Sequence, residues 1–130
     1  MAIRVVRLGT PRAPNEGVRL GTVRRPPRGV KKEEYASRNY FDLWLPDLAP
    51  TAAVVKYALS EDWTQERWEK YVRAYRREMR APEQQRLIAL LAALSHSADF
   101  SIGCYCEDPS HCHRSLLAEL LAEAGAKMAP

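Results

Sequence analysis

A chain of 130 residues has the size of one domain, and its composition, 46% hydrophobic and 28% charged, is ordinary for a globular protein. No apolar run approaches the roughly 20 residues of a membrane-spanning helix, and the first residues lack the apolar core of a signal peptide. The three cysteines are clustered and odd in number, which argues against a secreted disulfide framework. We therefore expect a single cytoplasmic domain over residues 1–130 that does not interact with membranes.

The net charge of +4 is concentrated in the first quarter of the chain. Residues 1–32 contain nine lysine and arginine residues and a single acidic residue, Glu16. This excess of positive charge favours an anionic partner such as a phosphate, a nucleotide or a nucleic acid. A solvated basic surface without a partner would give the same pattern.

Two short β-branched segments, residues 3–8 and 18–23, predict the first two strands, because turn residues follow the first and prolines the second. The stretch RRPPRGVKK at residues 24–32 predicts a loop rich in positive charge, which we call the basic loop. Its two prolines cannot donate hydrogen bonds to a sheet, and Gly29 permits a turn. Residues 39–45 are aromatic and apolar, which predicts a third strand.

Three helices are expected after this third strand. The first is capped by Thr51, and the second covers residues 61–79 with Asp62 as its N-cap. The third begins with the proline at residue 82 and runs to residue 96. The buried face of the third helix is expected to consist of Leu87, Leu90, Leu91 and Leu94.

The last predicted strand and helix contain every cysteine of the chain. Residues 99–106 predict the strand, and residues 112–125 predict an amphipathic helix. Strands separated by helices indicate an α/β fold, in one domain with a mostly parallel sheet of about four strands flanked by helices (a Rossmann-like three-layer arrangement). Ligands bind such sheets beyond the carboxyl ends of the strands, where the stretch CYCEDPSHCHR, residues 104–114, is expected to lie.

The stretches RRPPRGVKKEE, LWLPDLAPT and CYCEDPSHCHRSLLAELL occur in this order and resemble the YeaO-like branch of domain-of-unknown-function family 488. The resemblance covers about residues 3–125, and its most specific part is Cys-His-Arg at 112–114 with Cys104 eight positions earlier. One departure is Pro26, at a position where relatives usually have tryptophan. The family is defined without a biochemical role, so the resemblance implies a fold and a site but no reaction.

The cysteine-rich turn has four interpretations, and the first is a metal site. The ligands for zinc or iron would be Cys104, Cys106, Cys112 and either His113 or His111. On a regular strand, Cys104 and Cys106 are about 6.6 Å apart, so a single tetrahedral site would require the strand to break at Tyr105. Relatives tend to have an acidic residue in place of Cys106, which implies that a metal ligand is not obligatory there.

The second interpretation is a reactive thiol. Cys112 begins the last predicted helix, where backbone amides and the helix dipole stabilise a thiolate. Either His111 or His113 would act as the base or pair with the thiolate, and Asp108 is a further candidate acid or base. The spacing differs from the Cys-x5-Arg loop of phosphatases, because seven residues separate Cys106 from Arg114.

The third interpretation is an anion-binding pocket, which uses the largest number of features. The turn leads from a strand end to a helix N-terminus, whose free amides suit a phosphate or a carboxylate. Arg114, in the first turn of that helix, would bind the anion with two hydrogen bonds. The other candidate ligand-binding residues are Ser110 in the turn and Arg24, Arg28 and Gly29 in the basic loop.

In the fourth interpretation the turn is only structural: Cys104 is a small core residue, and Arg114 pairs with Asp108. We expect the anion pocket, a small anionic or nucleotide-like ligand and no cofactor. Two functions remain open: an enzyme acting on a nucleotide or another phosphorylated substrate, or a non-catalytic module that binds nucleic acid or a phosphorylated ligand.

Overall fold

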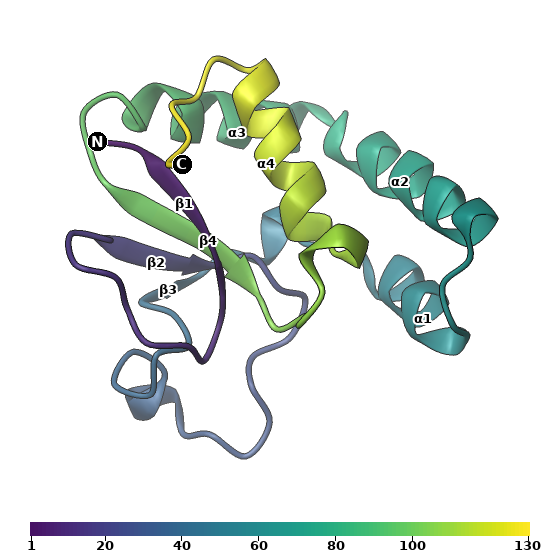
Figure 1. The fold of residues 1–130 in the computed structure, drawn as a ribbon, viewed down its shortest axis with the longest axis horizontal. Helices are drawn as coiled ribbons and strands as arrows, with labels where there is room; N and C mark the ends of the chain where they lie inside the picture. Colours follow the sequence, from purple (N-terminus) through teal and green to yellow (C-terminus); the bar gives the residue numbers. More distant parts are fainter.

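The structure is a computed structural model that describes residues 1–130 as one sheet with four α-helices and three short 3-10 helices (Figure 1). The strands are β1 (Ile3–Arg7), β2 (Val18–Gly21), β3 (Leu43–Trp44) and β4 (Phe100–Cys104). All strand pairs are parallel, and the strand order is β1-β4-β2-β3. The predicted α/β fold, a parallel sheet of about four strands flanked by helices, is confirmed.

Strand β4 lies inside the sheet and is buried along its whole length. A strand with neighbours on both sides and both faces covered needs small or apolar residues, and FSIGC supplies them. Arg7 of β1 aligns with Cys104 of β4, and Gly21 of β2 aligns with Gly103. The carboxyl ends of these three strands therefore meet at one edge of the sheet.

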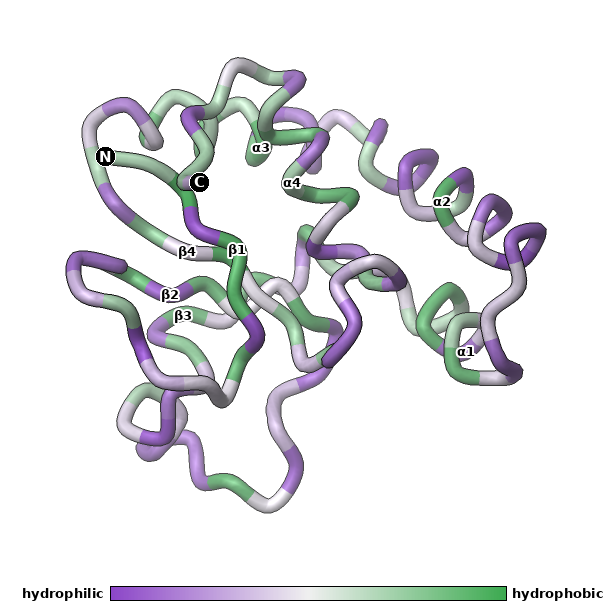
Figure 2. Tube along the Cα trace, viewed as in Figure 1, coloured by the Kyte–Doolittle hydropathy of each residue, from purple (hydrophilic) through white to green (hydrophobic).

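The helices are α1 (Ala52–Ser60), α2 (Gln65–Met79), α3 (Pro82–Leu94) and α4 (His113–Glu123). Figure 1 shows them to the right of and above the sheet. Leu117 and Leu121 of α4 are fully buried in one cluster with Ile3, Phe100 and Ile102 of the sheet. Burial of each such side chain contributes about 1.5–3 kcal/mol to stability. The hydrophobic segments of β1 and α4 contrast with the mostly hydrophilic trace of α2 in Figure 2.

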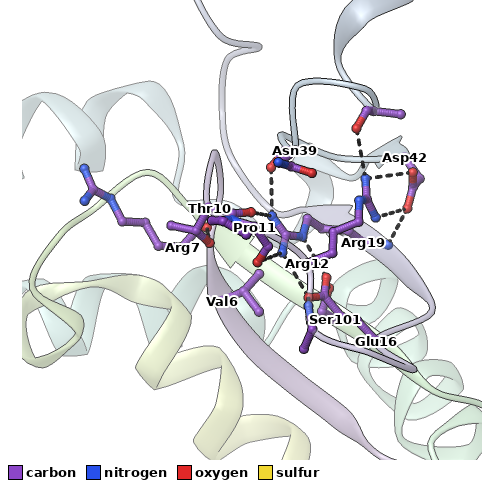
Figure 3. A network of polar contacts seen from close by, with 12 residues as sticks. Val6, Arg7, Thr10, Pro11, Arg12, Glu16, Arg19, Asn39, Asp42 and Ser101 are labelled. Atoms are coloured by element: carbon purple, nitrogen blue, oxygen red, sulfur yellow. Dashed lines mark hydrogen bonds and ion pairs between the residues drawn. The ribbon is translucent and has the colours of Figure 1, made fainter.

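The other face of the sheet is covered by the connections that follow β1 and β2. Gly21 has no room for a side chain, because an added Cβ would lie 2.3 Å from the ring of Phe41. Arg19 of β2 has no exposed surface and donates to both carboxylate oxygens of Glu16, at 2.7 and 2.9 Å (Figure 3). Its remaining hydrogen bonds tie both connections to the sheet through the carbonyl oxygens of Thr10, Pro11 and Asn39.

Strand β3 is shorter than the predicted strand over residues 39–45. Asn39 has a positive φ of 64°, so the backbone there is not extended, and Phe41 turns its ring into the core beside the sheet. Only Leu43 and Trp44 pair with β2. The apolar character of this segment therefore reflects burial of a loop as much as strand formation.

Two predictions about the helices were wrong in detail. Helix α2 begins at Gln65, because Thr64 rather than Asp62 is the N-cap and accepts a hydrogen bond from the Arg67 amide. Leu90 and Leu94 of α3 are 54% and 43% exposed, and the buried residues are Ile88, Leu91 and Ala92. This helix has more apolar positions than one face can bury. None of the helices is both long and apolar enough to cross a bilayer.

Candidate functional site

The chain changes direction directly after β4, and this reversal forms the candidate site. The strand ends at Cys104, and the backbone bends at Tyr105. A short 3-10 helix, Pro109–His111, then leads into α4, which begins at His113. The reversal lies at the edge of the sheet where the carboxyl ends of β1, β4 and β2 meet. We call residues 104–114 the cysteine turn.

The cysteine turn brings all three thiols together. The sulfur atoms of Cys104, Cys106 and Cys112 lie within 4.8 Å of one another, and those of Cys104 and Cys112 are in contact. The Cα atoms of this pair are 7.9 Å apart, beyond the roughly 4.4–6.8 Å of ordinary disulfides, so we describe the two residues as neighbouring thiols. Each of them is only 1% exposed, whereas Cys106 is exposed. A single metal site that uses all three cysteines requires the strand to break at Tyr105, and the backbone does bend at this residue.

Arg114 lies beside these thiols and is only 5% exposed. Its Nη1 atom lies 3.4 Å from the carbonyl oxygen of Val6, and 3.5 and 3.9 Å from the carbonyl oxygen and the sulfur of Cys104. Arg114 forms no salt bridge, so the pairing with Asp108 considered from the sequence is not formed. Burial lowers the pKa of Arg114, but a guanidinium stays charged in proteins.

Cys106 is the thiol with which Arg114 interacts electrostatically. Although the residue is exposed, its sulfur faces the other two thiols, and burial there raises the pKa of Cys106. The charges of Arg114 and Arg7 oppose this increase without reversing it. The neutral thiol is therefore favoured, and Cys106 does not supply a full negative charge to Arg114.

His113 is buried next to Cys112, with 7% of its surface exposed. Burial lowers the pKa of His113 to about 4, so the ring is neutral near pH 7. Its Nε2 atom faces the carbonyl oxygen of Thr22, which can only accept, so Nε2 carries the proton. The lone pair is then on Nδ1, 3.9 Å from the sulfur of Cys112. Nδ1 of His113 is thus placed to accept a hydrogen bond from that thiol.

Asp108 and Ser110 organise the cysteine turn itself. The Asp108 carboxylate accepts hydrogen bonds from the amide and the hydroxyl of Ser110, at 2.9 and 2.6 Å, and lies 3.0 Å from Nδ1 of His111. Hydrogen bonds from Ser110 and His111 lower the pKa of Asp108. Neither side chain caps α4, whose N-cap residue is Cys112.

The basic loop contributes its backbone to the site. The hydroxyl of Tyr105 donates to the carbonyl oxygen of Arg25 at 2.9 Å, which fixes the start of the loop beside the cysteine turn. Arg24 instead donates to three carbonyl oxygens around residues 46–50 and lines a separate cavity of about 460 Å³. Arg28 and Gly29 are exposed in the same loop, and Gly29 has a positive φ of 72°.

Two residues of the site were not identified from the sequence. Arg7 donates to the carbonyl oxygen of Tyr105 at 3.1 Å, and its charge acts on the Cys106 thiol. Arg7 is the last residue of β1, and the carboxyl ends of neighbouring parallel strands lie at the same edge of the sheet. Its position at a strand end could therefore have predicted that it belongs to the site. Tyr71 of α2 is buried close to Cys106 and the His113 backbone, and burial raises its pKa. No pattern in the sequence links Tyr71 to the cysteine turn.

Residues 3–125 match the family model DUF488-N3a, which is described as the active DUF488-N3 subclade. The chain belongs to this DUF488 family. The resemblance to family 488 found in the sequence is confirmed over nearly the whole chain, including the cysteine turn. Comparisons with curated proteins and with solved structures gave no match. The description of the family names no substrate, so the chemistry of this DUF488 protein has to be inferred from its site.

Proposed function

We propose that this DUF488 protein binds a small phosphorylated or nucleotide-like anion at Arg114. The observation that carries the proposal is that Arg114 is almost completely buried and has no acidic partner. The other fully buried arginine, Arg19, is bonded to both oxygens of Glu16. Arg114 contacts only neutral groups, so its buried charge lacks a counter-charge, which is unfavourable, and an oxyanion at Arg114 would supply one.

The N-terminus of α4 supports the same ligand. Its N-cap residue, Cys112, makes no side-chain hydrogen bond to the first turn of the helix. Amides at an uncapped helix start carry partial positive charge and are suitable donors for a phosphate. Arg114, in the first turn, adds a full charge and donors that match two oxygens of one phosphate group. The two features together favour a compact oxyanion over a neutral ligand.

The thiols give the site a route to catalysis. In the enzymatic form of the proposal, Cys112 and His113 are the candidate catalytic pair, with Nδ1 of His113 3.9 Å from the sulfur of Cys112, and Asp108 maintains the shape of the turn. Cys106 is the exposed thiol that a substrate would meet first. This chemistry requires reduced thiols, which fits the expected cytoplasmic location.

Phosphate binding tests the proposal directly. Arg114→Ala should weaken the binding of inorganic phosphate and of ADP by about tenfold to a hundredfold, since charge-assisted hydrogen bonds contribute about 1.5–3 kcal/mol. Arg114→Lys keeps the charge but loses the paired donors, so binding should weaken while the thermal midpoint stays close to that of the wild type. Isothermal titration calorimetry and thermal unfolding provide the two measurements.

The matched control is Arg86→Ala, which removes an exposed arginine of α3 away from the cysteine turn. This variant should bind phosphate like the wild type. Equal affinity of the Arg114→Ala variant and the wild type would refute the proposal. A loss of thermal stability in Arg114→Lys that parallels its loss of binding would instead assign Arg114 a structural role.

A second candidate function is the binding of nucleic acid through the basic loop. The observation that favours it is a group of four exposed cationic side chains without salt bridges, formed by Arg25, Arg28, Lys31 and Lys32. Such a surface binds phosphates along a chain, with little dependence on any single residue. Its salt dependence separates it from a compact anion site at Arg114.

A further inference from the structure

The sulfur atoms of the three cysteines lie close together, although a regular strand would hold the side chains of Cys104 and Cys106 apart. Side chains two positions apart on a strand lie on the same face about 6.6 Å from each other. Here β4 ends at Cys104 and the backbone bends at Tyr105, which brings the sulfur of Cys106 back toward that of Cys104. The 3-10 helix then places Cys112 at the start of α4, and all three sulfurs lie within 4.8 Å of one another.

The donors gathered here are all soft. No carboxylate shares the volume, because Asp108 is hydrogen-bonded to Ser110 and His111, and Glu107 faces Arg7 at 3.5 Å. A set of thiolates selects zinc, copper(I) or iron–sulfur clusters, and it disfavours magnesium and calcium. Thiolates at about 2.3 Å from one Zn²⁺ ion lie about 3.8 Å from one another in a tetrahedral site. Sulfur atoms within 4.8 Å of one another therefore suit a single ion.

The geometry points to a binding site for one Zn²⁺ ion, with Cys104, Cys106 and Cys112 as its ligands and a fourth position open to solvent on the side of Cys106. Two ligands are held rigidly, because Cys104 lies in the central strand and Cys112 begins α4, and each is 1% exposed. Three protein ligands with an open position are typical of zinc sites that bind a further molecule.

The charges around the site suit this occupant. Three thiolates and one Zn²⁺ ion carry a net charge of −1, and Arg114 lies 3.9 Å from the sulfur of Cys104. A positive side chain at that distance offsets the excess negative charge of the thiolates. The inference does not rest on phosphate binding, because Arg114 can compensate either a bound oxyanion or a zinc–thiolate group.

Zinc binding is measured on untagged protein that has been treated with a chelator and then titrated with Zn²⁺ in phosphate-free buffer. Native mass spectrometry should count one ion per chain. Replacement by Co²⁺ should give the charge-transfer absorption of thiolate ligands together with the visible bands of a tetrahedral site. A chain that takes up no ion, or a Co²⁺ complex without thiolate absorption, would overturn the inference.

Cys106→Ser is the decisive variant, because Cys106 is exposed and its replacement should not disturb the core. Removal of a residue that only hydrogen-bonds a metal ligand weakens metal binding by roughly 10–100-fold. Loss of Cys106, a direct ligand, should weaken Zn²⁺ binding by more than this. His96→Gln removes the one histidine outside the cysteine turn and should bind Zn²⁺ like the wild type. Unchanged zinc affinity in a folded Cys106→Ser variant, checked by circular dichroism, would refute the assignment.

The same variants separate this inference from the proposed function. Arg114→Ala should lose phosphate affinity but still bind one Zn²⁺ ion, more weakly than the wild type, because its three thiolate ligands remain. The chelator-treated wild type should bind phosphate without zinc. Phosphate binding without zinc binding would refute only the proposed zinc site. Zinc binding without phosphate binding would refute only the proposed anion site at Arg114.

Discussion

At the scale of single residues, the three cysteines differ sharply in accessibility although their sulfurs are neighbours. Cys104 and Cys112 are each 1% exposed, and Cys106 is exposed. The reactivity of a thiol depends on access and on the fraction of thiolate. Burial raises the pKa of Cys106, which slows its reaction, but the two buried thiols additionally require a local opening of the structure.

We expect one fast and two slow thiols in the metal-free protein. N-ethylmaleimide should first modify Cys106, and modification of Cys104 and Cys112 should follow only on a much longer timescale, because a reagent cannot reach them in the folded state. Mass spectrometry of the intact chain counts the modifications, and peptide mapping locates them. The control variant Cys106→Ser should lack the fast phase. Modification of Cys112 as fast as that of Cys106 would contradict the structure.

At the scale of elements, the face of the sheet opposite the helices is held by charge and hydrogen bonds. Arg19 joins β2 to Glu16, and the hydroxyl of Ser101 in β4 donates to the same carboxylate at 2.8 Å (Figure 3). Next to this group, Asp42 accepts two hydrogen bonds from Arg12 and one from the Arg19 amide. The connections after β1 and β2 therefore lie against the sheet without an α-helix of their own.

Removing the charge of Glu16 should destabilise the whole protein. Glu16→Gln leaves Arg19 buried with an incomplete partner, and loss of one member of a buried ion pair costs about 3–5 kcal/mol. Chemical denaturation at pH 7 measures this difference. The control Glu123→Gln alters an exposed pair with Arg76 and should change stability by no more than about 0.5 kcal/mol.

The same carboxylate predicts a pH dependence. Burial alone raises the pKa of Glu16, but hydrogen bonds from Arg19 and Ser101 outweigh this effect and lower it from 4.5 to about 2. Because the pKa is lower in the folded state, the stabilisation is complete above pH 4.5 and is lost as the pH falls toward 2. The wild type should lose stability over this range more steeply than Glu16→Gln. Parallel pH profiles for the two proteins would exclude this role of Glu16.

At the scale of the whole molecule, the fold was predictable because it depends on local patterns. Strand β4 and helix α4 follow from a short apolar run and from leucines at helical spacing. The site was predictable as a location, since a strand end and a helix start enclose the cysteine turn. Its composition was only partly predictable, because Arg7 enters from β1 and Arg24 binds carbonyl oxygens elsewhere.

The rest depends on contacts between distant segments. The pattern of α3 offers several possible buried faces, and only packing against α2 and α4 selects the one with Ile88 and Leu91. Convergence of the thiols depends on the bend at Tyr105, whose hydroxyl is held by the carbonyl oxygen of Arg25, 80 positions away in sequence. No local pattern contains this information.

The uneven charge of the whole chain leads to the last prediction, which tests the nucleic-acid alternative. If the four exposed cations of the basic loop bind phosphates of a DNA duplex, the logarithm of the affinity should fall with the logarithm of the salt concentration with a slope of about −4. Fluorescence anisotropy at several salt concentrations measures this slope. Replacing Arg25 and Arg28 by alanine should reduce it to about −2, whereas Arg114→Ala should leave it unchanged because Arg114 is buried. A slope near zero would exclude the basic loop as a nucleic-acid surface, and an equal loss of affinity in Arg114→Ala would assign DNA binding to the anion site.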